Sequence, residues 1–404
     1  MTTYRPGAPH RPPPPLADRG RRPRPLPLTA VWLLTRAGML LLLRYDDLGI
    51  GAVGLEVHGV YRRWYDQLAG GSFPAGDVTW QYPPGAGLVV LSPGLLPWLT
   101  YFQAFVALTL LADAAVTLLL ARAGGGAWLW TAGLPLLLHL PLARYDVQVT
   151  ALAVAGLLAV RAGRPRLGGV LAGLGTLVKV WPALTLLGAP PGRTTRRAWT
   201  SAALAAAAGL AVPALAFPHA LDFLRHQGGR GVQIESLGGT ALMVARLAGW
   251  PGRVEYRYGA FEFTGPQVAV VAQLSLLLTV AALGWLVAWR VGARRWTAAT
   301  AADAALTAVL LFTVTSRVIS PQYLVWLLGL GAVCLTSRHT VLRPVVLLLL
   351  PAAALSSLAY PVLYVDLLRV TPAACAVMVA RNGLLAAATV LACRRLWRAA
   401  RRGT

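Results

Sequence analysis

The sequence predicts an all-α polytopic membrane protein, a bundle of about ten or eleven transmembrane helices with two long external loops. Three observations predict this fold class. The 404 residues are 57% hydrophobic and only 13% charged, and the mean hydropathy is +0.60. The apolar residues also gather in runs near the ~20 residues that a helix needs to cross the hydrocarbon core. A soluble protein could not hide that much apolar surface.

The apolar runs place ten spans along the chain. In order, they cover residues 29–44, 100–121, 127–142, 147–162, 198–217, 267–289, 296–315, 322–337, 343–360 and 372–393. An eleventh apolar segment, 167–189, is broken by Pro182. Because proline ends a regular helix, this segment could also go in and come back as a re-entrant hairpin.

The basic residues orient the predicted bundle. Residues 1–28 lack the apolar stretch of a signal peptide and are expected to be a disordered, basic, cytoplasmic tail. Residues 29–393 form the transmembrane domain, and residues 394–404 form a second basic cytoplasmic tail. This orientation places about 23 of the 37 basic residues in the cytoplasm, as the positive-inside rule requires. We therefore expect a multi-pass protein of the plasma membrane with both termini inside.

The acidic residues collect on the opposite side. About eleven of the 14 Asp and Glu residues fall outside in this topology, most of them in two long external loops near 45–85 and 218–266. Long loops on a rigid scaffold commonly carry the functional residues. The active site is therefore expected on the external face.

Several function classes receive no support. The net charge of +23 is spread in short clusters between apolar runs, which does not resemble a nucleic-acid interface. The cysteines, Cys334, Cys375 and Cys393, show no metal or redox spacing. No P-loop or His/Cys cluster is present. The sequence therefore requires no metal and no cofactor.

The first loop carries the candidates for a general base. Glu56 follows the first span, and Asp77 lies in the segment "GDVTWQYPPG" (76–85); an ionised carboxylate can accept a proton from a reacting hydroxyl. Pro83 and Pro84 set where the chain re-enters the membrane. Trp80 and Tyr82 are expected at the membrane interface, where such rings are enriched.

Basic residues suited to a phosphate are spread over three further segments. Arg144 and Asp146 lie at an external helix boundary, where Asp can orient Arg. Lys179 is the one lysine among 37 basic residues and lies in an apolar segment, which marks it as functional or as a side chain that snorkels to the interface. The second loop has glycines that allow close approach to a ligand, with His226, Arg230, Gln233 and Glu235 around them. Arg317 and Gln322 flank Pro321 at an external helix start.

Taken together, these segments resemble glycosyltransferase family 87, actinobacterial integral-membrane mannosyltransferases of the GT-C superfamily that use polyprenyl-phosphate sugars. The resemblance rests on Glu56, Tyr61 with Trp64, Gly71 with Pro74, Asp77, Tyr82-Pro83-Pro84, Arg144 with Asp146, Gly173 to Pro182, Arg230 to Ser236, and "SPQY" at 320–323. The family usually has Asp at the first of these positions. Glu56 reaches one methylene further, so Asp77 is kept as a second candidate for the base.

The resemblance implies a GT-C-like bundle that moves a hexose, mannose, from a polyprenyl monophosphate to a hydroxyl of a lipid or glycan acceptor, with inversion. Glu56 or Asp77 would act as the base. Lys179, Arg144, Arg230 and His226 would bind the donor phosphate. Asp146, Tyr82, Gln233, Glu235, Arg317 and Gln322 would bind the remaining parts of the substrates. The rival hypothesis is a lipid-linked-sugar flippase or transporter that uses Asp113, Asp303 and Lys179 as an intramembrane charge path.

Overall fold

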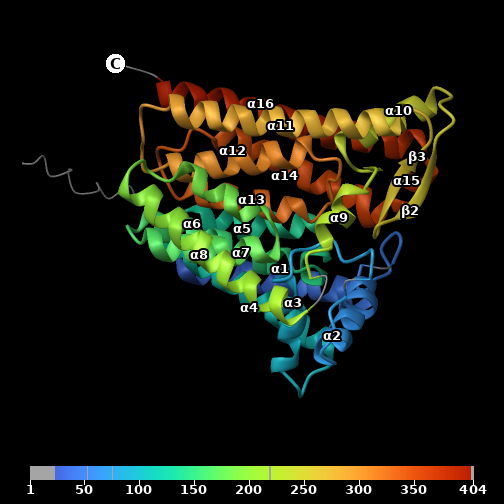
Figure 1. Cartoon of the computed structure of the whole chain (residues 1–404), viewed down its shortest axis with the longest axis horizontal. Helices are drawn as coiled ribbons and strands as arrows, with labels where there is room; N and C mark the ends of the chain where they lie inside the picture. Colours follow the sequence, from blue (N-terminus) through green and yellow to red (C-terminus); the bar gives the residue numbers. More distant parts are fainter. Residues whose placement is uncertain (1–22, 52, 75, 218–219, 402–404) are drawn as a thin grey trace, which may run out of the picture.

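The protein is an all-α polytopic membrane protein whose helices run side by side along the long axis of the molecule (Figure 1). The computed structural model describes residues 23–51, 53–74, 76–217 and 220–401, without the side chains of residues 225–227. Six helices in this part of the chain are long and apolar enough to cross a membrane. They are α1 (Pro25–Tyr45), α4 (Tyr101–Ala123), α8 (Arg193–Ala216), α11 (Val268–Gly292), α14 (Arg343–Ser357) with its π-helical continuation η6 (Leu358–Val362), and α16 (Pro372–Arg401).

The remaining predicted spans correspond to shorter helices between the long ones. These are α5 (Gly126–Gly133) with the 3₁₀ turn η3 (Leu134–Leu137), α6 (Asp146–Arg161), α12 (Thr300–Thr315) and α13 (Tyr323–Leu335). Each of the ten predicted spans therefore falls on a helix of the bundle. A further short helix, α3 (Ala86–Leu91), precedes α4.

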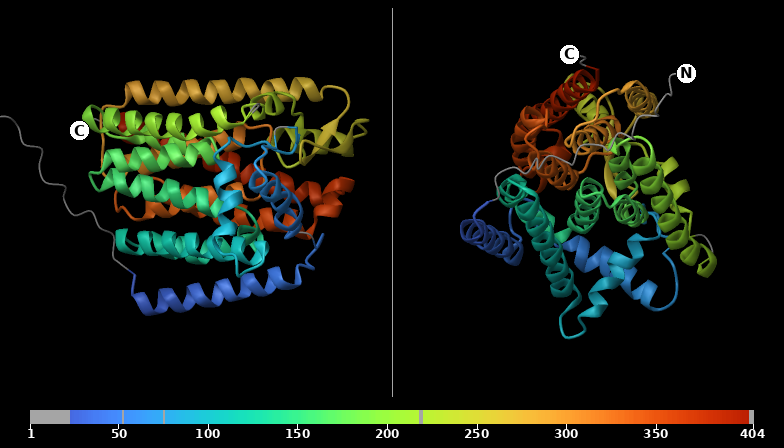
Figure 2. Two further views of the ribbon diagram at one scale, coloured as in Figure 1. Left: turned by 60° about the horizontal axis from the view of Figure 1, so that its bottom comes forward. Right: turned by 90° about the vertical axis from the view of Figure 1, so that its left-hand side faces the viewer.

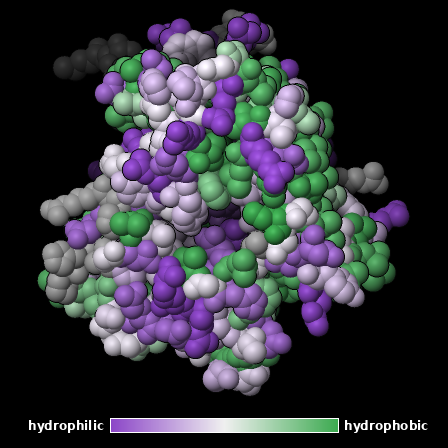
Figure 3. All heavy atoms as spheres, turned by 90° about the vertical axis from the view of Figure 1, so that its right-hand side faces the viewer, coloured by the Kyte–Doolittle hydropathy of each residue, from purple (hydrophilic) through white to green (hydrophobic). Residues whose placement is uncertain are grey.

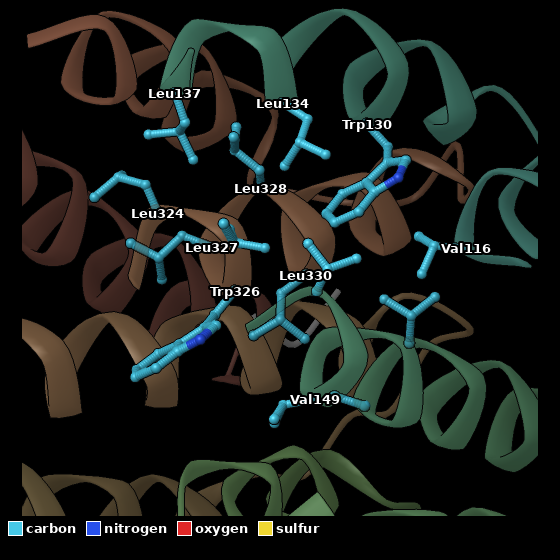
Figure 4. Close-up of a cluster of buried hydrophobic side chains, with 14 of the residues drawn as sticks. Val116, Trp130, Leu134, Leu137, Val149, Leu324, Trp326, Leu327, Leu328 and Leu330 are labelled. Carbon is cyan, nitrogen blue, oxygen red and sulfur yellow. The ribbon is translucent and has the colours of Figure 1, made fainter. Parts of the chain in front are cut away.

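The bundle core is built around α13. Every residue from Leu324 to Cys334 in this helix is buried, and a helix that is apolar on all sides requires neighbours on all sides. Figure 4 shows Leu324, Leu327 and Leu328 of α13 facing the leucines of η3, with Trp130 of α5 nearby. The short length of α13 is compatible with a bundle because protein, not lipid, surrounds it. By contrast, α8 and α11 lie at the periphery, where most of their apolar residues are exposed.

The ambiguous segment 167–189 forms a helical hairpin. Helix α7 (Pro165–Val178) ends at Lys179, and the 3₁₀ helix η5 (Trp181–Gly188) follows directly. The two arms pack closely, since a Cβ on Gly175 would lie 3.0 Å from Pro182. At the far end of the return arm, Gly188 packs against Ala301 in the first turn of α12. Lys179 therefore lies at the tip of the hairpin.

The two ends of the bundle differ in character. At one end, called the basic end below, α1 begins and α16 ends (Figure 2). Backbone and side-chain contacts join the connections there: Arg294 N donates to Ala400 O at 3.2 Å, and Arg290 Nη2 donates to Thr195 Oγ1 at 2.8 Å. The predicted tail 394–404 is helical as far as Arg401 because it continues α16, whereas residues 1–22 and 402–404 lie outside the described residues.

The opposite end, called the loop end, carries the two long loops (Figure 1). The first contains the π-helical turn η1 (Glu56–Tyr61) and α2 (Arg62–Ala69). The second contains α9 (Phe223–Gly228), α10 (Leu237–Leu247) and an antiparallel sheet of β1 (Val232–Gln233), β2 (Arg253–Arg257) and β3 (Ala260–Thr264) in the order β1-β3-β2. Val232 pairs with Phe263 on one side of β3, and Glu255 pairs with Glu262 on the other. The 3₁₀ turn η4 (Leu140–Ala143) and α15 (Tyr364–Arg369) complete this end.

Candidate active site

A cavity of about 540 Å³ opens at the loop end of the bundle. Its walls come from the first loop, the tip of the α7–η5 hairpin, the second loop and the turn between α12 and α13. Figure 3 looks onto this end and shows a hollow near the middle with hydrophilic atoms inside it. The volume is in the range that small-molecule sites occupy.

Most of the residues that the sequence singled out line this cavity. They are Glu56, Tyr82, Arg144, Lys179, Arg230, Gln233, Glu235, Arg317 and Gln322. Asp146 lies directly behind the wall, in contact with Lys179. Asp77 lies outside the cavity lining, and the side chain of His226 is outside the described residues. Segments as distant in the chain as residues 56 and 322 thus contribute to one space.

Glu56 presents a carboxylate with unused hydrogen-bonding capacity. It is the first residue of η1, and its side chain is 32% exposed. Its contact is an ion pair with Arg144, whose Nη2 lies 3.5 Å from Oε2 of Glu56. Arg144 is itself fixed, because its Nη1 donates to the carbonyl oxygens of Val53 at 3.0 Å and Ala143 at 2.7 Å. Within the described residues, no donor hydrogen-bonds to the Glu56 carboxylate, so it can accept a proton from a ligand.

Asp77 is engaged by its own loop. Oδ1 accepts from the backbone N–H of Thr79 at 2.9 Å and from the Thr79 hydroxyl at 2.6 Å. Oδ2 accepts from Trp64 Nε1 at 2.9 Å and from Arg63 Nη2 at 3.2 Å. Partial burial would raise the pKa of this carboxyl, but the hydrogen bonds from Thr79 and Trp64 outweigh it and hold the pKa below its usual value. Asp77 thereby fastens the stretch 76–85 to α2.

Lys179 occupies a cage of aromatic rings. Its Nζ lies 2.7 Å from Oδ1 of Asp146 and 4.7 Å from the centre of the Tyr145 ring. The rings of Tyr82, Tyr323 and Trp326 lie at 5.5, 5.9 and 5.1 Å. Trp326 Nε1 also donates to Oδ1 of Asp146 at 2.6 Å. Only 9% of the lysine side chain is exposed, so the ammonium is a buried charge held by one carboxylate and by cation–π contacts.

The second loop and the α12–α13 turn form the wall opposite the first loop. Arg230 Nε lies 3.3 Å from Oε1 of Glu262, and Arg317 Nη1 donates to the carbonyl oxygen of Arg230 at 2.8 Å. Gln233 joins the two segments, because its Oε1 accepts from the backbone N–H of Ile319 at 3.1 Å. Its Nε2 donates to Oε2 of Glu235 at 2.8 Å. These bonds fix Arg230 and Gln233 on one rigid surface.

Glu235 is a buried acid with one unsatisfied oxygen. Its Oε1 has no hydrogen-bond partner among the described residues, although the side chain faces the cavity. Burial raises the pKa of its carboxyl to about 7, against the opposing effects of the Arg381 charge and the Gln233 hydrogen bond. Arg381 lies in α16 and is fully buried; its Nη1 donates to the Glu235 backbone oxygen at 2.9 Å. Sequence reasoning missed Arg381, although an arginine inside an apolar span is itself a signal.

Aromatic residues form most of the remaining wall. The rings of Tyr323 and Trp181 both stack on the ring of Trp326, with ring centres 3.9 and 5.2 Å from it. Tyr256 in β2, Tyr258 in the β2–β3 turn and Tyr360 in η6 also line the cavity. They were missed because single tyrosines carry no sequence pattern. Trp80, expected at the membrane interface, is instead buried against Trp64 at 4.9 Å, since it forms the small core of the first loop.

The two acids of the proposed charge path lie elsewhere and have partners. Asp113 in α4 accepts hydrogen bonds from Arg36 (Nε and Nη2, both 2.8 Å), Trp32 and Trp130. Asp303 in α12 accepts from the Thr340 hydroxyl at 2.6 Å. Neither lines the cavity, so both act in helix packing. Within the described part of the chain, no group of three or more His, Cys, Asp or Glu residues could hold a metal.

Comparison with known proteins adds one match. The family model "Glycosyltransferase family 87" matches residues 80–321. This range contains Tyr82, Arg144, Asp146, Lys179, His226, Arg230, Gln233, Glu235 and Arg317, whereas Glu56 and Asp77 precede it and Gln322 follows it. No curated protein and no solved structure matches the chain.

Proposed function

Because this chain belongs to glycosyltransferase family 87 and is a membrane glycosyltransferase, we propose that it transfers a hexose from a polyprenyl monophosphate to a hydroxyl group of a lipid or glycan acceptor. Mannose is the sugar that the sequence resemblance favours. The reaction inverts the anomeric carbon and takes place at the external face of the plasma membrane. A polyprenyl donor suits a membrane-embedded enzyme, because its tail stays in the bilayer while its head enters the cavity.

One observation carries this proposal. The Glu56 carboxylate, which has room to accept a proton, shares a single cavity with the buried or half-buried cations Lys179 and Arg230. Inverting transfer needs a base on one side of the sugar and positive charge on the other, where a phosphate departs. The cavity offers both kinds of group.

In the proposed step, the acceptor hydroxyl gives its proton to Glu56 while its oxygen forms a bond to the anomeric carbon. The bond between that carbon and the phosphate oxygen breaks, and its electron pair stays on the departing polyprenyl phosphate. A phosphate is already a good leaving group, so no acid is needed. Cations at the departing oxygens lower the barrier, because they bind the charge that develops there.

We divide the cations between these two sides. Arg144 lies 3.5 Å from Glu56, so we assign it to the base side, where it positions the carboxylate. Lys179 and Arg230 are then assigned to the donor phosphate, and His226 is added from the sequence alone, because its side chain lies outside the described residues. Tyr82, Gln233, Glu235, Arg317 and Gln322 line the space left for the sugar and acceptor, and Asp146 orients Lys179. Asp77 supports the loop and is the second candidate for the base.

The test is transfer by the purified protein in nanodiscs, supplied with labelled polyprenyl phosphomannose and a crude lipid acceptor extract. Glu56→Gln keeps the shape of the side chain but cannot take the proton. We expect it to lower turnover by about 100-fold or more, the contribution typical of a general base, while donor binding persists. Undiminished turnover would exclude Glu56 and move the same test to Asp77.

Glu255→Gln is the matched control. This substitution removes the same charge from a glutamate in β2 that is exposed and lies outside the cavity lining. We expect it to leave turnover unchanged. Movement of intact donor across vesicles without sugar transfer would instead support the flippase.

A further inference from the structure

A second cavity, of about 440 Å³, adjoins the first. The two share Arg230 and Arg317 in their linings. The second cavity is otherwise bounded by the β3–α11 connection and by the first turns of α11. A ligand head held by Arg230 and Arg317 could therefore reach into both spaces.

The side of the second cavity that faces away from α11 is basic. Arg230, Arg257 and Arg317 line it together with one acid, Glu262. Glu262 is occupied, because its Oε1 pairs with Arg230 and its Oε2 accepts from the backbone N–H of Gly231 at 2.9 Å. Three guanidinium groups against one carboxylate leave net positive charge, which suits a phosphate.

The side of the second cavity along α11 is largely apolar and opens onto an exposed face. Its lining there consists of Val268, Ala269, Ala272 and Leu276 with one polar residue, Gln273, all on α11. This helix is apolar and peripheral, and the leucines that follow along it are more than half exposed: Leu276 at 57% and Leu277 at 63%. In a membrane, that face of α11 meets lipid chains.

We propose that the second cavity binds the first isoprene units of the polyprenyl donor, with the sugar in the first cavity. The phosphate then lies at Arg230, where the two cavities meet, between Lys179 of the first cavity and Arg257 and Arg317. This assignment rests on the proposed function, since it uses the same donor. It predicts that the donor enters from the lipid along α11, and it leaves the first-loop side of the first cavity, beside Glu56, to the acceptor.

The occupant follows from how the two kinds of surface are joined. A basic side continuous with a largely apolar groove suits a molecule that carries an anionic head on a single apolar chain. The groove lies beside one helix and offers a path for one chain. A polyprenyl monophosphate has this form, whereas a phospholipid would have to place a second chain elsewhere.

The test compares two donors, one with a full-length chain and one, the short-chain donor, in which a methyl group replaces the isoprene units. Ala269→Trp fills the groove without touching the first cavity. We expect it to lower kcat/KM for the long-chain donor by about tenfold or more, because several buried methylene contacts are lost. Activity with the short-chain donor should be retained, which also shows that the variant folds.

Val270→Trp is the matched control, since Val270 is the next residue, is 53% exposed and does not line the cavity. It should leave both donors unaffected. Equal losses for both donors in Ala269→Trp, or no loss for either, would overturn the proposal.

A binding experiment separates this proposal from the proposed function. Polyprenyl phosphate without sugar, carrying a photoreactive group in its second isoprene unit, is cross-linked to the unmodified protein and the labelled peptide is identified. We expect labelling within residues 268–276, competed by polyprenyl phosphate and not by phosphatidic acid. Labelling elsewhere, or competition by phosphatidic acid, would overturn the assignment even in an active transferase. Labelling of α11 in a protein without transfer activity would instead reject the transferase mechanism and keep the lipid site.

Discussion

Two carboxyl groups at the loop end have pKa values displaced in opposite directions. The pKa of Asp77 is lowered by hydrogen bonds from Thr79 and Trp64, which outweigh its partial burial. Asp77 therefore stabilises the fold above its unfolded pKa, and this contribution is lost as pH falls through the lower folded value. Glu235 behaves in the reverse way, because burial raises its pKa to about 7. The two acids thus have different uses: one is ionised and fixes a loop, and the other can be neutral within the cavity wall.

The raised pKa of Glu235 predicts a pH-dependent stability. The folded state holds the proton more tightly than the unfolded state, so the contribution of Glu235 is complete below about 4.5 and is lost as pH rises through about 7. Thermal unfolding in detergent from pH 5 to pH 8 should show the melting temperature of the unmodified protein falling relative to that of Glu235→Gln. Parallel profiles would show that Glu235 does not titrate in this range.

The ion pair between Lys179 and Asp146 predicts strong coupling. Lys179→Met leaves a buried carboxylate and Asp146→Asn leaves a buried ammonium, so each should destabilise the protein by about 3–5 kcal/mol. The double variant removes both charges and should cost less than the sum of the two single changes. Urea or thermal unfolding of the four proteins measures the coupling. Strictly additive losses would mean that the cage of rings, rather than the pair, holds Lys179.

At the scale of elements, apolar runs were sufficient to locate the helices. A helix in this bundle is apolar both where it faces lipid and where it packs in the core. The ten predicted spans coincide with helices, and the break at Pro182 correctly allowed for the α7–η5 hairpin. The small sheet of the second loop escaped prediction, because β1 has only two residues and its partner begins at residue 260. Burial of Trp80 was also missed, since a pattern cannot distinguish a loop core from a membrane interface.

The sequence also identified many of the residues that line the cavity, but it did not predict the contacts between them. Polar residues in loops predicted which side chains gather, but the Arg381 contact to Glu235 spans 146 residues and depends on the docking of α16. The separation of Asp77 from the cavity likewise depends on the side chains of Thr79 and Trp64. Such contacts follow from tertiary packing and leave no local signature.

The contact between α7 and α8 depends on glycine. A Cβ on Gly173 would lie 2.5 Å from the carbonyl oxygen of Ala202, and one on Gly169 would lie 2.1 Å from that of Ala198. This spacing of small residues allows close approach of two helices in a membrane. We expect Gly173→Ala to destabilise the protein by about 1–3 kcal/mol, because the backbones must separate.

Gly284→Ala in α11 is the control for this change. A Cβ at Gly284 has no heavy atom within 4 Å, and the residue lies inside a helix. Alanine there should be neutral or stabilising by about 0.5–1 kcal/mol, its usual advantage over glycine in a helix. Melting temperatures in the same detergent compare the two variants. Similar melting temperatures would argue that α8 can adjust without cost.

At the scale of the whole molecule, three acids at the loop end have individual structural reasons to be there. Asp46 accepts from the backbone N–H of Gly54 at 2.8 Å and pairs with His139 Nε2 at 2.9 Å. Asp77 fastens the end of the first loop, and Glu262 holds Arg230 at the boundary of the two cavities. The basic end has no comparable need, because its loops are short. The long loops at one end therefore account both for the acids that gather there and for the cavity that opens there.

This arrangement predicts the orientation of the protein in the membrane. Arginines at the basic end favour the cytoplasmic side, which would place the cavity outside. Ser72 is exposed in the first loop and Ala298 is exposed between α11 and α12 at the basic end. In intact cells, a membrane-impermeant maleimide should label Ser72→Cys directly and Ala298→Cys only after permeabilisation. The unmodified protein measures the background from Cys393, which is partly exposed, since Cys334 and Cys375 are buried. The reverse labelling order would place the cavity in the cytoplasm and require a donor presented from the inner leaflet.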